Sequence, residues 1–218
     1  MSIPAFHIII PARLNSSRLP RKLLLEVNGM PIIEHVYRQC LKVGAASVTI
    51  ATDSNEILRK AQDFGAPVLM TGEHASGTDR IAEAARAMDL PGDAIIVNVQ
   101  GDEPQMQAEL VVQVASLIAT YSTHWASLYW PIEHHNDFLN PNIVKVVVDN
   151  QDKALYFSRS PIPYYRDKPD HLPKALRHIG LYAYRMESLQ RWVKSPVSLL
   201  EQYESLEQLR ALSLGMSI

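Results

Sequence analysis

Hydrophobic positions follow two alternating patterns in the first half of the chain. Short continuous apolar runs, such as FHIII at 6–10 and AIIVNV at 94–99, are typical of buried strands. Apolar residues at helical spacing separate these runs. The pattern predicts strands at 6–10, 47–52, 67–71 and 94–99, and helices at 32–43, 55–64, 78–88 and 108–120. Buried strands alternating with helices predict a mostly parallel sheet covered on both faces.

The second half has a different pattern. Strand-like segments are predicted at 125–132, 142–150, 154–159 and 177–185, and a long amphipathic helix near 199–212. We therefore expect a single domain over residues 1–218, with a three-layer α/β fold and a mostly parallel central sheet. A β-excursion near 125–185 is expected to be added to it, and such excursions often pair subunits.

Composition narrows the classes of protein to be considered. The chain has 21 Lys and Arg residues against 23 Asp and Glu, a net charge of −2, whereas nucleic-acid and membrane-surface proteins are usually strongly basic. No apolar run reaches membrane-spanning length, and no signal peptide is expected. The single cysteine, Cys40, has apolar neighbours at helical spacing and is predicted to be a buried helix residue. These features favour a cytoplasmic protein without nucleic-acid or membrane partners.

A short loop after the first predicted strand is rich in cations. PARLNSSRLPRKLL, at 11–24, contains Arg13, Arg18, Arg21 and Lys22, but it matches neither a Walker A nor a GxGxxG motif. Guanidinium groups bind phosphate oxygens in pairs, and a lysine neutralises a further charge. The loop therefore favours a polyphosphate site, with a solvated basic connector as the alternative.

A second loop, NVQGDEP at 98–104, follows the most apolar predicted strand. Ligands in open α/β sheets bind beyond the carboxyl ends of the strands. Asp102 and Glu103 offer carboxylates to a hard cation such as Mg²⁺, and Gly101 permits close approach to the backbone. An ordinary Gly-Asp turn is the alternative.

Three other segments carry weaker signals. In HASGTDR, at 74–80, Ser76 and Asp79 form a capping-box pattern that predicts the start of a helix, and Arg80 adds a cation. One predicted strand places three side chains on a shared face, where ordinary packing is the usual explanation: His178, Tyr182 and Tyr184. The predicted last helix carries glutamates at a spacing of three, typical of a solvated acidic stripe: Glu201, Glu204 and Glu207.

Seven segments, taken together and in order, resemble one enzyme family. They are PARLNSSRLPRK, HASGTDR, NVQGDEP, NPNIVKVVVD, ALYFSRSPIP, RHIGLYAYR and LEQYESLEQLR. This series is similar to that of the 3-deoxy-manno-octulosonate (KDO) cytidylyltransferases, also called CMP-KDO synthetases. The resemblance covers nearly the whole chain and implies a Rossmann-like nucleotidyltransferase fold that uses the excursion for dimerisation.

The resemblance also implies a reaction. The C2 hydroxyl of KDO attacks the α-phosphorus of CTP, with Mg²⁺ as cofactor, and pyrophosphate leaves. The product, CMP-KDO, serves lipopolysaccharide biosynthesis, and the enzyme is expected to be a cytoplasmic homodimer. Two alternatives stay open: a cytidylyltransferase for a related sugar acid such as 8-amino-KDO, and a truncated CTP-binding form with impaired catalysis.

Site residues follow from the resemblance position by position. The implied nucleotide-binding set is Pro11, Ala12, Arg13, Arg18, Lys22, Ser76, Arg80, Gln100 and Gly101. The implied sugar-binding set is Gln100, His178, Tyr182, Glu207 and Gln208. Arg18, Lys22 and Asp102 are the implied catalytic residues, with Asp102 as the magnesium ligand.

The chain departs from the family pattern at two places. The family usually has glycine at the position of Arg21. It also continues into a C-terminal segment with a GxDTPxDL sequence, whose first aspartate is expected to be a second metal ligand. The sequence ends at Ile218 before such a segment, and the alternative of impaired catalysis depends on this difference.

Overall fold

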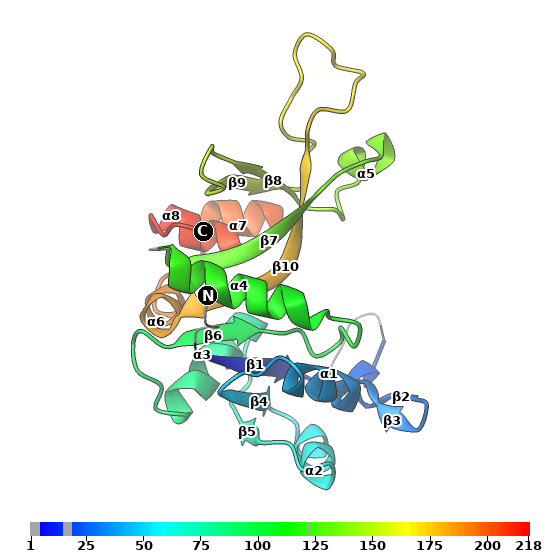
Figure 1. Ribbon diagram of the computed structural model, residues 1–218, viewed down its shortest axis with the longest axis vertical. Helices are drawn as coiled ribbons and strands as arrows, with labels where there is room; N and C mark the ends of the chain where they lie inside the picture. Colours follow the sequence, from blue (N-terminus) through cyan, green and yellow to red (C-terminus); the bar gives the residue numbers. More distant parts are fainter. Residues whose placement is uncertain (1–4, 15–18, 122) are drawn as a thin grey trace.

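A single mixed sheet forms the centre of the fold (Figure 1). The computed structural model describes residues 5–14, 19–121 and 123–218. The strands of this sheet are β1 (Phe6–Ala12), β4 (Ser47–Thr52), β5 (Val68–Met70), β6 (Ile95–Asn98), β7 (Trp125–Pro131), β8 (Lys145–Val148), β9 (Ala154–Ser158) and β10 (Leu176–Arg185). Their order is β5-β4-β1-β6-β10-β8-β9, and β7 also pairs with β10.

The two halves of the sheet differ in whether neighbouring strands run parallel or antiparallel. Strands β5, β4, β1 and β6 run parallel to their neighbours, whereas β10 is antiparallel to β6, β7 and β8, and β8 is antiparallel to β9. Ile8 on β1 is aligned with both Val48 and Val97. The prediction of an α/β fold with a parallel first half is confirmed, and the antiparallel strands come from the second half, where the hydrophobic pattern changes.

Helices and short elements connect these strands. The helices are α1 (Ile32–Leu41), α2 (Asn55–Asp63), α3 (Gly77–Ala87), α4 (Ala108–Thr120), α5 (His135–Leu139), α6 (Met186–Val193), α7 (Leu199–Glu204) and α8 (Gln208–Ser213). The 3-10 turn η1 (Lys22–Leu24) and the ribbon of β2 (Glu26–Val27) and β3 (Met30–Pro31) follow β1. Within the described residues, no helix is both long and apolar enough to cross a membrane.

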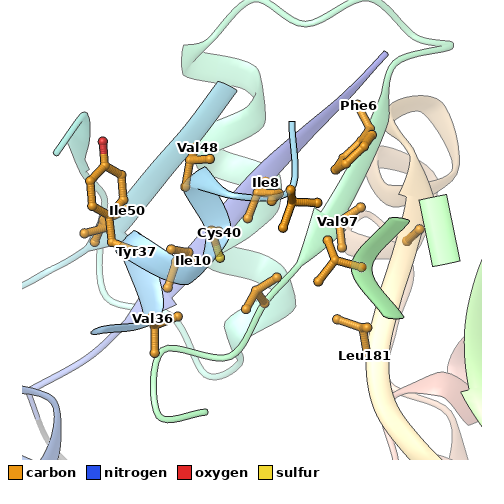
Figure 2. Packing of buried hydrophobic residues seen from close by; sticks show 14 of the residues in the cluster. Phe6, Ile8, Ile10, Val36, Tyr37, Cys40, Val48, Ile50, Val97 and Leu181 are labelled. Atoms are coloured by element: carbon orange, nitrogen blue, oxygen red, sulfur yellow. The ribbon is translucent and has the colours of Figure 1, made fainter. Parts of the chain in front are cut away.

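The core lies on both faces of the sheet, as a three-layer fold requires. On one face, Ile8 and Ile10 pack with α1 and α4 residues, and Figure 2 shows Val36 and Cys40 of α1 among them. On the other face, Ile9 packs with side chains of α3 and α6. The buried position predicted for Cys40 is confirmed, and burial raises the pKa of its thiol to about 12.

The predicted long helix near 199–212 is wrong. Two short helices, α7 and α8, occupy this stretch, because Ser205 adopts a left-handed conformation with φ 51° and ends α7. No glycine or proline marks that break in the sequence, so the helical periodicity appears continuous. Helix α6 was not predicted, although its sequence MESLQRWV directly continues the predicted strand that ends at Arg185.

Part of the segment 125–185 projects from the body of the protein (Figure 1). Strands β7 and β10 extend away from the parallel half, and the loop between β9 and β10 reaches furthest from it (Figure 1). Several large apolar side chains of this region are exposed: Trp130, Leu139, Leu155 and Tyr164.

Arg21 adopts a conformation that suits glycine. It precedes η1 with φ 59° and ψ 23°, a left-handed conformation that costs a residue with a Cβ about 1–2 kcal/mol. Its guanidinium pairs with Glu56 of α2, and both side chains are exposed, so this ion pair contributes about 0–1 kcal/mol.

We therefore expect Arg21→Gly to be more stable than Arg21→Ala by about 1 kcal/mol in the free energy of unfolding, measured by urea denaturation. Both variants lose the same ion pair with Glu56, so the difference between them isolates the backbone conformation. Equal stability of the two variants would show that the left-handed backbone carries no cost here.

Candidate functional site

The loops at the carboxyl ends of the parallel strands meet around one cleft. It is lined by residues from β1 and its following loop, from the loop and first turn of α3, and from the end of β6: Pro11, Ala12, Arg13, His74, Ser76, Gly77, Arg80 and Gln100. Six of these residues belong to the nucleotide-binding set implied by the sequence. His74 and Gly77 were missed, although both lie within the HASGTDR segment.

Close packing of β1 against the loop after β6 shapes one wall of the cleft. A Cβ on Gly101 would lie 3.1 Å from the carbonyl oxygen of Pro11 and 3.3 Å from Cδ1 of Ile33. A larger residue at this position would push the loop after β6 slightly away from β1 and α1. The close approach of these protein segments therefore favours glycine, independently of any ligand.

Helix α3 begins at the cleft, and its start is fixed as predicted. Ser76 is the N-cap: its Oγ accepts a hydrogen bond from the backbone N–H of Asp79 (3.1 Å) and donates one to Oδ2 of Asp79 (2.9 Å). The positive end of the helix dipole therefore faces the cleft, where it favours an anion.

Arg80 has structural partners in addition to its place in the cleft wall. Its side chain is almost fully buried, donates to Thr71 Oγ1 (2.7 Å) and forms an ion pair with Asp53. These contacts tie α3 to the loops that follow β4 and β5. Asp53 and Thr71 were not singled out from the sequence, because nothing in their local pattern signals a partner on a later helix.

The cationic loop contacts the loop after β6 directly. Lys22 Nζ donates to Asp102 Oδ2 at 2.7 Å, and both side chains are partly exposed. Two residues implied to be catalytic are thus neighbours.

The other cations of the loop after β1 have different surroundings. Arg13 is exposed beside the cleft, and Arg21 points to α2 instead. Arg18 lies outside the described residues. Burial, followed by the charge of Asp102, raises the pKa of the adjacent Glu103.

The aromatic part of the implied sugar-binding set lies on β10. The shared face predicted for His178, Tyr182 and Tyr184 is confirmed: ring centroids are 5.3 Å apart for His178 and Tyr182 and 6.0 Å apart for Tyr182 and Tyr184. Burial lowers the pKa of His178 to about 4, so its imidazole is neutral at pH 7, and Nε2 lies 2.8 Å from Ser127 Oγ. Burial also raises the pKa of Tyr182.

Glu207 connects the sugar-binding set to the first turn of α3. Thr78 Oγ1, within HASGTDR, donates a hydrogen bond of 2.6 Å to Glu207 Oε2. Burial is the largest influence on Glu207 and raises its pKa, and the Thr78 hydrogen bond opposes that shift. The next residue, Gln208, is buried at the start of α8.

The three glutamates of the expected acidic stripe do not form one. Glu201 pairs with Arg210, Glu204 accepts hydrogen bonds from Ser158 and from the backbone of Arg159, and Glu207 bonds to Thr78. The break at Ser205 turns the glutamates toward different partners. Each carboxylate is therefore used inside the fold instead of being solvated on one helix face.

Comparisons with known proteins show which family of enzymes this chain matches. A model of the family described as cytidylyltransferase matches residues 7–218. The chain is 48% identical to a 3-deoxy-manno-octulosonate cytidylyltransferase of Marinomonas sp. (strain MWYL1), with 100% of this chain and 87% of the relative covered. It is 50% identical to the enzyme of the same name from Legionella pneumophila (strain Corby), with 98% and 86% covered.

A solved structure agrees with these matches. CMP:2-keto-3-deoxy-manno-octonic acid synthetase complexed with CTP superposes with a TM-score of 0.90 at 42% identity, over 99% of this chain and 88% of that one. The chain belongs to the cytidylyltransferase family and is therefore a nucleotidyltransferase. Within that family it groups with the 3-deoxy-manno-octulosonate cytidylyltransferases, which confirms the resemblance found in the sequence.

Proposed function

We propose that this protein transfers CMP from CTP to the C2 hydroxyl of KDO, giving CMP-KDO and pyrophosphate for lipopolysaccharide biosynthesis in the cytoplasm. The observation that carries the proposal is the meeting of both implied substrate sets at α3. Ser76 and Arg80 of this helix line the nucleotide cleft, and Thr78 between them binds Glu207 of the sugar-binding set. Relatives named for this reaction share about half of their residues with the chain.

The residues of the cleft suit the binding and orientation of a nucleoside triphosphate. Arg13, Lys22 and the start of α3 supply positive charge on the side where the triphosphate would lie, and Arg18 is proposed to join them. The C2 oxygen then bonds to the α-phosphorus as the bond to pyrophosphate breaks. Such chemistry depends mainly on positioning and charge neutralisation.

Mg²⁺ is the proposed cofactor, and Asp102 the proposed ligand. No cluster of three or more His, Cys, Asp or Glu side chains suited to a metal exists among the described residues. The part-exposed carboxylate of Asp102 nevertheless fits Mg²⁺, which commonly binds one or two carboxylates and takes its other ligands from phosphates and water. When bound, the ion would neutralise charge on the transferring phosphates. Asp102 would then be shared with Lys22, which it contacts at 2.7 Å.

Pyrophosphate release tests the proposal directly. The 218-residue chain is incubated with CTP and Mg²⁺, with and without KDO, and release is expected only when KDO is present. Release that is faster with 8-amino-KDO than with KDO would assign the related sugar acid instead. Binding of CTP without release under any condition would support the alternative of impaired catalysis.

We also propose that the protein is a homodimer that pairs through the excursion at 125–185. The support is its group of exposed apolar side chains, including Trp130 and Leu155, on strands that project from the body (Figure 1). Sedimentation equilibrium is expected to give twice the mass of the 24.5 kDa chain. A mass of one chain at micromolar concentration would contradict the proposal.

A further inference from the structure

We propose that Thr78 is a positioning residue for Glu207, which its hydroxyl contacts at 2.6 Å. This inference rests on the proposed function, because Glu207 is taken as a residue that binds the sugar acid. In this arrangement, one hydroxyl in the first turn of α3 orients the Glu207 carboxylate.

The hydrogen bond joins the first turn of α3 to the residue that precedes α8. Thr78 Oγ1 donates to Glu207 Oε2 at 2.6 Å. The neighbouring buried polar groups have partners of their own: Gln100 Nε2 donates to Asn98 Oδ1 (3.4 Å), and Asn98 Nδ2 donates to the hydroxyl oxygen of Tyr184 (3.2 Å). Thr78 is therefore the described residue whose side chain holds the Glu207 carboxylate.

The direction of this bond follows from the groups that form it. The threonine hydroxyl has one proton, which goes to Glu207 Oε2. An ionised carboxylate only accepts hydrogen bonds, and a bond to a charged group is stronger than one between neutral groups.

The polar groups around Glu207 are buried, so each of them needs a hydrogen-bond partner. Thr78, Asn98 and Tyr184 are 4%, 3% and 1% exposed, and a buried polar group without a partner is costly. A threonine in a first helical turn needs no partner 129 positions away, yet this hydroxyl bonds to Glu207. Oε1 of Glu207 accepts no hydrogen bond from any described residue, so it remains available for a substrate hydroxyl.

The test compares Thr78→Val, which keeps the side-chain shape but removes the donor, with Thr78→Ser, which keeps the donor. For Thr78→Val we expect kcat/KM for KDO to fall about ten- to a hundredfold, the loss typical of a hydrogen bond to a charged group. The KM for CTP is expected to stay within about twofold, and Thr78→Ser is expected to keep most of kcat/KM.

The pH profile supplies a readout that a merely structural role would not move. The Thr78 hydrogen bond opposes the raised pKa of Glu207, so its loss raises that pKa further. The acid limb of kcat/KM for KDO is therefore expected to shift to higher pH in Thr78→Val. The charged and titratable groups that face Glu207 are the same in both variants: Asp79, Tyr182, Tyr184, Glu201 and Arg210.

Three outcomes would overturn the inference: wild-type kcat/KM for KDO in Thr78→Val, equal losses for CTP and KDO, or a Thr78→Ser variant as impaired as Thr78→Val. Failure of the proposed function is a separate result, because it would appear in the wild-type chain as an absence of KDO-dependent pyrophosphate release.

Discussion

Replacing Asp102 with asparagine is expected to reduce KDO-dependent pyrophosphate release by at least about a hundredfold. The substitution keeps the size of the side chain but removes the charge that holds Lys22 at 2.7 Å and that would hold Mg²⁺. The measurement is kcat at saturating CTP and KDO over a series of Mg²⁺ concentrations. Because Asp102 is part-exposed on a loop, the fold is expected to survive, with an unchanged far-UV circular dichroism spectrum.

The neighbouring carboxylate offers a matched control. Glu103→Gln makes the same chemical change one residue away, at a carboxyl whose pKa is raised by desolvation and by the charge of Asp102. We expect this variant to keep activity within a few-fold of the wild type. Wild-type rates in Asp102→Asn, or equal losses in both variants, would remove the assignment of Asp102 as the specific metal ligand.

The parallel half of the fold could be predicted from the sequence because its strands are buried on both faces. A strand such as β1 presents Ile8 and Ile10 to one layer of helices and Ile9 to the other, so it appears as one continuous apolar run. The bounds of β4 and α4 agree with the predicted ranges 47–52 and 108–120.

The C-terminal part could not be predicted in the same way. Residues 205–207 separate α7 from α8, and Ser205 ends α7 in a left-handed conformation that local propensity does not favour. Glu201, Glu204 and Glu207 keep a spacing of three on either side of the break, but their partners lie on α8, β9 and α3. Sequence spacing carries no information about partners so far away in the chain.

The candidate site, like the fold, could be predicted from the sequence only in part. The loops that hold it follow strands or precede a helix, so their motifs could be located from the sequence alone. Which side chains touch within it depends on distance in three dimensions. The contact of Lys22 with Asp102 spans 80 positions and that of Thr78 with Glu207 spans 129, and neither pair has a local signature.

Arg210→Met is expected to lower the free energy of unfolding by about 3–5 kcal/mol, since it would leave a buried carboxylate without its cation. Arg210 donates from Nε and Nη2 to the two oxygens of Glu201 at 2.7 and 2.6 Å, and both side chains are about nine-tenths buried. The guanidinium also lies 3.8 Å from the ring centroid of Trp192. Urea denaturation followed by circular dichroism measures the loss.

An exposed ion pair of the same chemistry provides the control for that loss. Arg166 and Asp167 are 88% and 75% exposed and 3.1 Å apart, so Arg166→Met is expected to change stability by less than about 0.5 kcal/mol. The double variant Arg210→Met/Glu201→Gln removes the stranded charge together with its partner, and it is expected to be more stable than Arg210→Met alone. A double variant no more stable than Arg210→Met would show that the loss comes from the packing of Arg210 on Trp192 instead of from the unpaired carboxylate.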